Sequence, residues 1–341
     1  MRKFELTASS LLNDPDPRLP GGGTLVSSPR DFHRPVPASS LPRRLLSPPI
    51  CPDFLDRFLS GRLSEDERRA VGFREQTSRP ELVERTVLEV AGTVLAAQLA
   101  LRHGMASNVA GGTHHATKDE GRGYTILNDL ATAAYLMTWN DDDEARVDGS
   151  SPEEAELLRG LYRGDGPVER VLVVDADVHQ GDGTATFHNA PGSPLYGRLF
   201  TLDVHASNNY PARKEGCTYG IGLPDGTDDD GYLAALSDSL DIAIHEVRPH
   251  LVLYNAGVDV HEHDKLGRLD LTYDGIRRRD EHVVRTCRSA GVPVACTVGG
   301  GYSDDPAEVA GRHATVHRVC AEVWREERGE GGSVKKKGHS S

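Results

Sequence analysis

The stretch VLVVDADVHQGDGTATFH, residues 171–188, begins as an apolar run and ends in acids, histidines and glycines. Its first four residues show no polar alternation, which predicts a strand buried on both faces. The glycines break the run, so Asp175, Asp177 and His179 fall at the carboxyl end of that strand, where open α/β sheets bind their ligands. At alternate positions of an extended segment, the three side chains project from the same side.

Two carboxylates and an imidazole that converge in a partly buried place need a cation to offset the cost of their desolvation. A metal ion is the simplest such cation. A plainer interpretation is a helix cap and turn at a strand-to-helix junction. That interpretation accounts for one aspartate and the glycines, but not for three aligned residues of the ligand type. The stretch therefore favours a metal site at the edge of a sheet.

The composition bounds the kind of protein. With 341 residues and 37% hydrophobic content, the chain can bury a large core, as one large α/β domain or two smaller ones. The net charge of −13 disfavours direct binding to nucleic-acid phosphates and suits a partner that carries lysines. No apolar run approaches the roughly 20 residues of a membrane span. We therefore expect a soluble protein that binds neither nucleic acid nor membrane.

The cysteines and the two ends of the chain bear on its compartment. The cysteines are odd in number, scattered and without a Cys-x-x-Cys pair, which favours free thiols in a reducing compartment: Cys51, Cys217, Cys287, Cys296 and Cys320. The first ten residues contain no continuous hydrophobic segment, so a secretory signal is not expected and the cytoplasm is the default. A basic run, Lys335 to Lys337, resembles a weak nuclear signal, so the nucleus or an organelle stays open.

The N-terminal third changes character along its length. Residues 13–50 are rich in proline, serine and glycine, which predicts loop or disorder rather than core. The segment SRPE that follows predicts a helix with Ser78 as N-cap, Pro80 in the first turn and Glu81 completing a capping box. Gly104 is expected to end that helix.

Five apolar runs then follow, and each ends in unusual polar residues. The runs are MASNVAGGTHH (105–115), VLVVDADVH (171–179), LFTLDVH (199–205), LVLYNAGVD (251–259) and VPVACTVGGGY (292–302). Helix-like stretches such as 231–247 and 274–290 lie between them. This alternation predicts an α/β fold, a three-layer α/β/α sandwich with a mostly parallel central sheet. The acidic segment 139–169 is interpreted as a solvated excursion with one short helix.

The polar endings together indicate a reaction class. Asp177, His179 and Asp259 would hold a zinc ion and leave its fourth position open for water, which is the pattern of a catalytic site. The metal would lower the pKa of that water and polarise a carbonyl. Tyr302 follows three glycines that let the backbone approach a ligand closely, and it would donate a hydrogen bond to the oxyanion.

The adjacent histidines, His114 and His115, complete this constellation. They could supply the general base and the general acid, and each needs an acidic partner to fix its tautomer. Asp175 and Asp182 are the candidates for these partners. The residues therefore predict metal-assisted hydrolysis of an amide.

Several separated motifs occur in an order that resembles a known family. They are GGTHHA, GRGYTILND, VVDADVHQGDGT, FTLDVH, GLPDGTDDDGYL, NAGVD, DKLGRLDLT, RRDEHVV and GGGY. They resemble the zinc-dependent histone deacetylase family of the arginase-deacetylase superfamily, over residues from about 52 to about 323. Gln180 and the phrases DGTDDDGYL and DKLGRL are more similar to the class IV enzymes and their bacterial relatives than to class I.

The resemblance implies roles for single residues. It implies one zinc ion per chain, with Fe²⁺ or another divalent ion as an alternative, and it allows a structural K⁺. It implies metal ligation by Asp177, His179 and Asp259, a histidine pair of His114 backed by Asp175 and His115 backed by Asp182, and polarisation of the carbonyl by Tyr302. Tyr124 and Tyr210 fall where the family has the aromatic walls of a narrow acyl-lysine channel, although ordinary core packing explains them equally well. Gly123, Gly300 and Gly301 are expected to line the same channel.

The resemblance also divides the chain into parts. A catalytic domain is expected over residues 51–326, and residues 327–341 are expected to form a disordered tail. Residues 1–50 match poorly, because the usual first strand and its Pro-Met-x-Lys segment are missing, so a truncated start is expected there. Relatives often carry a histidine near positions 50 and 51, where this chain has isoleucine and cysteine, so substrate preference is expected to differ.

Several functions remain open from the sequence. The leading prediction is removal of acetyl or longer acyl groups from lysine side chains of proteins. The first alternative is deacylation of small amines such as acetylpolyamines. An arginase-like site with two manganese ions would need Asp-x-His-x-Asp, whereas this chain has Asp-x-Asp-x-His. A catalytically silent binding module is the alternative outside enzymes, and such relatives usually lose a ligand or the tyrosine, neither of which is lost here.

Overall fold

A six-stranded sheet forms the centre of the computed structural model, which describes residues 2–16, 23–35, 37, 46, 49–139 and 168–329. The strand order is β1-β6-β5-β2-β3-β4, and every pairing is parallel. The strands are β1 (Met105–Ser107), β2 (Val171–Asp175), β3 (Leu199–Ala206), β4 (Tyr219–Leu223), β5 (Leu251–Asn255) and β6 (Val294–Thr297). Because all strands run the same way, their carboxyl ends lie along one edge.

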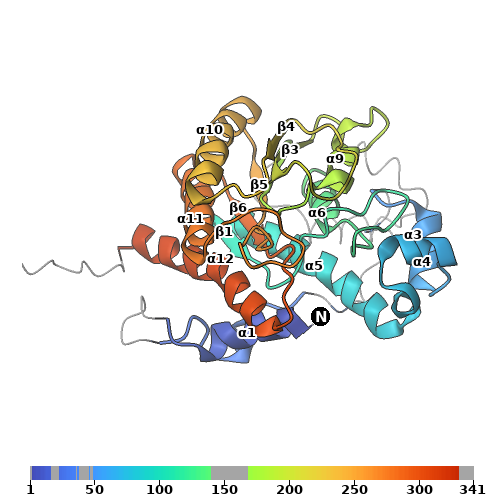
Figure 1. Ribbon diagram of the computed structural model, residues 1–341, viewed down its shortest axis with the longest axis horizontal. Coiled ribbons are helices and arrows are strands. Elements are labelled where there is room, and N and C mark those ends of the chain that lie inside the picture. The colour runs from blue at the N-terminus through green and yellow to red at the C-terminus, as the bar shows by residue number, and fades with distance from the viewer. Residues whose placement is uncertain are drawn as a thin grey trace, which may run out of the picture.

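Helices cover both faces of this sheet (Figure 1). Val171 and Val173 of β2 belong to one buried core, and Leu172 and Val174 belong to the other. The first core includes side chains of α3 (Pro52–Leu59), α5 (Pro80–His103), α6 (Asp129–Met137) and α9 (Asp182–Asn189). The second includes side chains of α10 (Asp229–Val247), α11 (Tyr273–Ser289) and α12 (Pro306–Glu327). The predicted three-layer α/β/α sandwich is confirmed.

The apolar runs predicted five of the six strands but not β4. β4 reads YGIGL, and its residues alternate between partly buried and exposed until the final leucine, the two exposed ones being glycines. Two glycines in a short edge strand weaken the sequence signal for a strand. The helix-like stretches 231–247 and 274–290 correspond closely to α10 and α11.

The start of α5 differs from the predicted capping box. Ser78 lies in the short helix η4 (Arg74–Ser78), and its hydroxyl donates to the Glu75 carbonyl at 3.0 Å. Arg79 is the N-cap and makes no side-chain capping bond, so the prediction for Ser78 is wrong. Pro80 begins the helix as expected. Gly104 ends it with a left-handed φ of 92°, which glycine adopts without strain.

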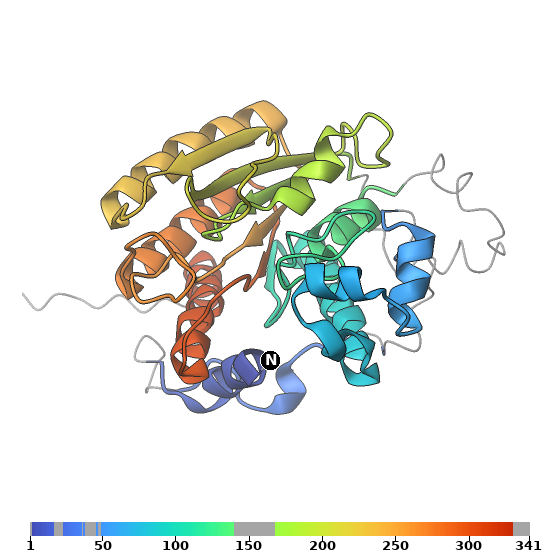
Figure 2. The ribbon, with the colours of Figure 1, turned by 45° about the vertical axis from the view of Figure 1, so that its right-hand side comes forward.

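The N-terminal segment holds more structure than its composition suggests. Helix α1 (Arg2–Asn13) lies beside α12 (Figure 2), where Arg318 Nη2 donates to Ser10 Oγ at 3.3 Å. Leu46 and Ile50 belong to the first core, against the expectation of loop for 13–50, because both side chains are almost fully buried. A short helix, η2 (Pro29–Asp31), also lies in this segment, and α4 (Glu65–Val71) follows α3.

Some expectations fall on other parts of the chain. Most of the acidic segment 139–169, most of the tail 327–341 and Lys335 to Lys337 lie outside the described residues. Over the residues that are described, no helix is long and apolar enough to cross a membrane. All five cysteines are free, as predicted.

Candidate active site

The predicted site residues lie where the strands end. Asp175 is the last residue of β2, and Asp177 and His179 follow it directly. Asp259 comes shortly after β5, and Tyr302 comes shortly after β6. The histidine pair follows β1 in the chain. These strands occupy neighbouring positions in the sheet, so one edge brings together residues that are far apart in sequence.

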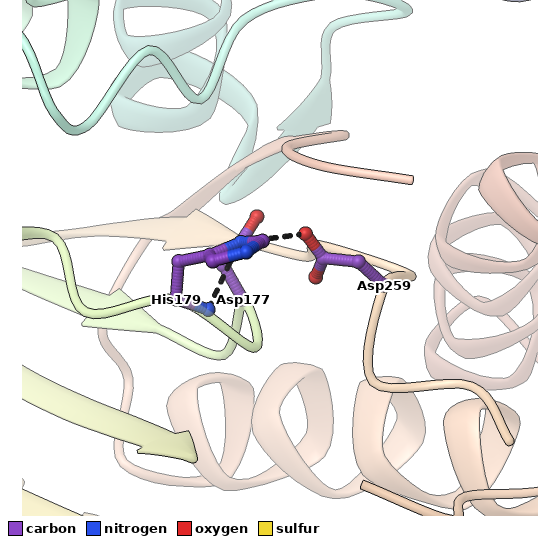
Figure 3. Close-up of side chains that lie close together, drawn as sticks. All are labelled: Asp177, His179 and Asp259. Atoms are coloured by element: carbon purple, nitrogen blue, oxygen red, sulfur yellow. Dashed lines mark hydrogen bonds and ion pairs between the residues drawn. The ribbon is translucent and has the colours of Figure 1, made fainter. Parts of the chain in front are cut away.

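Asp177, His179 and Asp259 form a buried trio whose ligand-type atoms lie within 4.8 Å of one another (Figure 3). His179 Nδ1 lies 3.1 Å from Asp177 Oδ1 and 3.1 Å from Asp259 Oδ2. The other two carboxylate oxygens are held by the main chain. Asp177 Oδ2 accepts the Gly300 N–H at 2.7 Å, and Asp259 Oδ1 accepts the Val178 N–H at 2.9 Å. Each carboxylate therefore turns one oxygen toward the imidazole.

The charges of this trio are strongly coupled. Burial alone would lower the pKa of His179, but its hydrogen bonds to Asp177 and Asp259 outweigh burial and raise the pKa to about 10. Burial and the negative Asp177 raise the pKa of Asp259 to about 7. A proton on Nδ1 thus joins the two carboxylates at the point that a cation would occupy. Two carboxylate oxygens and one imidazole nitrogen suit a divalent ion such as zinc, so the donor set fits a metal.

Two glycines after β6 let the backbone approach the trio closely. A Cβ at Gly300 would collide with the carboxylates of Asp177 and Asp259, so only glycine lets its N–H reach Asp177. A Cβ at Gly301 would lie 2.7 Å from Val258 and 2.9 Å from Val309. Both positions therefore require glycine because the backbone approaches its neighbours so closely.

His114 and His115 each pair with a different carboxylate. His114 Nδ1 lies 2.7 Å from Asp175 Oδ2, and His115 Nδ1 lies 2.7 Å from Asp182 Oδ1. The two Nε2 atoms meet at 3.1 Å. At that distance one of the two nitrogens carries the hydrogen and the other accepts it.

The two histidines have opposite proton affinities. Burial opposes the charge on His114, but the carboxylates of Asp175 and Asp177 outweigh it and raise the pKa of His114 well above its ordinary value. Burial, followed by repulsion from His114, lowers the pKa of His115 to about 4 in spite of Asp182. At neutral pH, and without a metal ion, His114 is therefore the proton donor and His115 the neutral acceptor.

Two partners of this pair escaped the sequence analysis. Arg122 Nη2 lies 2.9 Å from Asp182 Oδ2, and its Nε donates to the His115 carbonyl at 3.0 Å. Asn255 Nδ2 donates to Asp175 Oδ1 at 2.9 Å. Arg122 stands inside the motif GRGY and Asn255 ends a predicted strand, so position in a motif was the available signal for both.

Tyr302 and the other predicted aromatic residues surround the trio. The Tyr302 ring centroid lies 6.3 Å from that of His179, and its backbone N–H donates to Asp264 Oδ2 at 2.7 Å. The Tyr210 ring lies 4.9 Å from the His115 ring, nearly perpendicular to it. Tyr124 is 52% exposed and Tyr210 is 41% exposed, so neither is ordinary core packing.

Gly123 lets the backbone of its loop approach the histidine pair closely. Its φ is 56°, and a Cβ there would lie 2.7 Å from His115 Cδ2 and 3.1 Å from the Tyr210 ring. A cavity of about 700 Å³ opens beside these residues and is lined by Gly123, Tyr124, Gly300, Gly301 and Tyr302, among others. Tyr210 borders the histidines without lining this cavity.

The same cavity extends to helix α1, which was not expected at the site. Lys3 and Glu89 are among its lining residues. Lys3 Nζ donates to the Gly299 carbonyl at 3.2 Å and lies 5.6 Å from the Tyr302 ring centroid. Burial lowers the pKa of Lys3 and raises the pKa of Glu89. No local pattern linked the first helix to the glycine turn, which lies 296 residues later.

Comparison with known proteins identifies the family. A family model for the histone deacetylase domain matches residues 51–147 and 158–317. The chain belongs to the histone deacetylase family. It is 40% identical over 274 residues to an uncharacterized protein of Picosynechococcus sp., covering 80% of each chain. It is 31% identical over 224 residues to histone deacetylase 2 of Arabidopsis thaliana. That match covers 65% of this chain and 50% of the Arabidopsis protein.

The fold agrees with that of a solved crystal structure. The HDA15 HD domain superposes with a TM-score of 0.60 at 17% identity, covering 94% of this chain and 80% of that one. The family model and the histone deacetylase relatives confirm the predicted family and the predicted type of enzyme, a deacylase-type amide hydrolase. The class IV-like subtype stays a prediction.

Proposed function

We propose that this histone deacetylase family member hydrolyses the amide bond of Nε-acyl-lysine and releases the lysine amine and a carboxylate. The observation that carries the proposal is the meeting of the trio and the histidine pair beside one cavity. A trio with three ligand-type atoms and a neighbouring proton acceptor is what metal-assisted amide hydrolysis needs.

Zn²⁺ is the proposed ion, held by Asp177, His179 and Asp259. When bound there, a divalent ion would activate water and polarise the acyl carbonyl. One ion per chain is proposed because, among the described residues, this trio is the one such cluster. Fe²⁺ accepts the same ligands, so loading with each metal is part of the test. A structural K⁺ stays a prediction.

The remaining residues would move protons and stabilise charge. Neutral His115, held through Nδ1 by Asp182, is the group suited to accept a proton from water. His114, held through Nδ1 by Asp175, faces it at 3.1 Å and would stabilise the charge on His115 until that proton passes to the leaving amine. Tyr302 would donate a hydrogen bond to the carbonyl oxygen as that oxygen becomes negative. Its pKa is raised well above the ordinary value, chiefly by burial, so the phenol keeps its proton.

The exposed aromatic residues beside the site suit a substrate with a long side chain. Tyr210 exposes aromatic surface beside His115, and Tyr124 does so beside Tyr302, which suits the apolar methylenes of an acyl-lysine. A lysine side chain of a protein is the proposed substrate. Small acylated amines share the same amide, so they form a separate arm of the test.

The Tyr302→Phe variant tests the proposal. With metal-loaded protein, we expect hydrolysis of acetylated and longer acylated lysine peptides to fall by about a hundred- to a thousandfold, the usual cost of one oxyanion donor. Phenylalanine keeps the ring, so metal content and melting temperature should remain parental. Near-parental turnover in a folded, metal-loaded variant would contradict the proposed role. Faster turnover of acetylpolyamines than of peptides by the parent would assign the small-amine substrate instead.

A further inference from the structure

Arg279 on α11 is a fully buried cation that lies beneath the trio and that the proposed chemistry does not use. Its side chain is 0% exposed. Nη1 donates to the Ala176 carbonyl at 3.0 Å and to the Gly257 carbonyl at 2.5 Å. Ala176 stands 103 residues before Arg279 in the chain, and Gly257 stands 22 residues before it. One guanidinium therefore joins the segments that follow two different strands.

These two segments carry the two carboxylates of the trio. Ala176 immediately precedes Asp177, and Gly257 stands two residues before Asp259. Their separation sets the distance between the carboxylates, because side chains as short as aspartate cannot compensate for a shift of the backbone. The segments are packed tightly as well, since a Cβ at Gly257 would lie 2.7 Å from the Asp177 Cα.

A second set of contacts fixes the guanidinium itself. Asp280 Oδ1 accepts Arg279 Nε at 3.0 Å and Nη2 at 2.8 Å, and it accepts the Tyr254 hydroxyl at 2.7 Å. Asp280 is also buried, and its Oδ2 has no hydrogen-bond partner among the described residues. The donors thus converge on one oxygen and hold the planar fork of Arg279 in a single orientation.

Such a buried pair is a poor way to stabilise a fold. The cost of desolvating two charges often exceeds their attraction, and well-packed apolar side chains of similar size usually do as well. The particular ability of a guanidinium is to bind two carbonyls at a fixed spacing while it is held from behind. We infer that Arg279 is a positioning residue that sets the spacing of Asp177 and Asp259 for metal binding.

The inference rests on the proposed metal site, and it is tested by metal affinity rather than by turnover. Arg279→Lys keeps the charge but cannot hold both carbonyls and Asp280 together. Partners that orient metal ligands usually contribute about ten- to a hundredfold in affinity. We expect the dissociation constant of the full chain for Zn²⁺, measured by competition with a chromogenic chelator, to rise by that factor. The visible absorption of the Co²⁺-loaded variant should also change, because it reports coordination geometry.

Tyr254→Phe is the matched control. It removes one hydrogen bond to Asp280 at a fully buried position and leaves the contacts of Arg279 with both carbonyls in place. It should lower the melting temperature of the metal-free protein while its Zn²⁺ affinity and Co²⁺ spectrum stay parental. If Arg279→Lys lowers the melting temperature equally and also leaves affinity and spectrum parental, Arg279 is only structural and the inference is overturned.

A variant that does not fold and a parent chain that binds no metal have different meanings. Should Arg279→Lys fail to fold, Asp280→Glu carries the same test, because it keeps both charges while displacing the guanidinium by one methylene. A weakened Zn²⁺ affinity then supports the inference, and a parental affinity overturns it. A parent chain that binds no divalent metal would instead overturn the proposed function itself.

Discussion

Two histidine–aspartate pairs stand side by side in the site, and they behave oppositely. Both pairs join an Nδ1 to a carboxylate oxygen at 2.7 Å. Yet the pKa of His114 is raised well above its ordinary value, whereas the pKa of His115 is lowered to about 4. The pairs differ in what surrounds them. His114 Nε2 lies 3.8 Å from Asp177, whereas the partner of His115, Asp182, is bound by Arg122.

A histidine's carboxylate partner therefore does not by itself decide its proton affinity. Without a metal ion, a second carboxylate near one ring keeps it charged, and burial together with that charge holds the neighbouring ring neutral. Two adjacent residues of the same type thus become a proton donor and a proton acceptor.

The largest effect is expected when the acceptor is removed. His115→Ala should lower turnover by about a hundred- to ten-thousandfold, the range for loss of a proton-transfer group. Bound metal should remain, because His115 is not part of the trio. Steady-state kinetics with elemental analysis of the same sample measures both. A variant that also lost its metal would show that His115 helps to hold the ion, and the distinction between the two pairs would fail.

The next largest effect is expected in metal affinity, when the carboxylate partners of the two histidines are changed. Asp175 also accepts the Asp177 N–H at 3.2 Å, so it supports the trio as well as His114. Asp175→Asn is expected to weaken metal binding by about ten- to a hundredfold, as for other groups that orient ligands. Asp182→Asn is the control and should reduce turnover while leaving metal affinity parental. Equal metal affinities for the two variants would remove this part of the difference.

A smaller effect is expected from Arg122→Met. Removing the cation leaves the charge of Asp182 uncompensated, so protonation of His115 becomes easier and its pKa rises. The acid limb of the pH–rate profile should move toward higher pH by at most about one unit, so turnover on that limb falls by less than about tenfold. Glu120, which lies 3.5 Å from Arg122 on the exposed side, offers the control Glu120→Gln, which should leave the limb in place. A shift toward lower pH would reverse the explanation.

The smallest effect on turnover is expected at His317, a buried histidine on α12. The pKa of His317 is lowered to about 4, chiefly by burial, with a hydroxyl partner, Ser107, instead of a carboxylate. A histidine with a lowered pKa stabilises the fold fully above its ordinary pKa near 6.5, and this contribution is lost as the pH falls toward 4.

His317→Leu should therefore make the free energy of unfolding less dependent on pH between 6.5 and 4, by up to about 3 kcal/mol over that window, and leave turnover at neutral pH unchanged. Chemical denaturation at a series of pH values measures the slope. An unchanged slope would show that burial alone does not set the proton affinity of a histidine in this chain.

The strands and the trio were open to prediction because their signals are local. An apolar run that ends in glycine and acids marks the carboxyl end of a buried strand, and parallel strands bring those ends together. The trio around Asp177 followed from that rule. β4 did not, because its glycines and alternating exposure weaken the pattern.

The electrostatics of the site could not be predicted in the same way. The opposite proton affinities of His114 and His115 depend on their burial, on the carboxylates near His114 and on the repulsion between the two rings, none of which a spacing in the sequence encodes. Lys3 reaches the glycine turn only because α1 lies against α12. Contacts between segments remote in sequence require the fold before they can be named.

The main-chain donors to the trio have a consequence for protein engineering. The N–H groups of Val178 and Gly300 hold the outer oxygens of Asp259 and Asp177, and no substitution other than proline deletes a peptide N–H. A mutant library can therefore vary the groups around the trio while this support survives in every clone that keeps the path of the backbone. Removing either donor without the constraint of a proline ring takes chemical synthesis, with an ester in place of the amide at position 178 or 300.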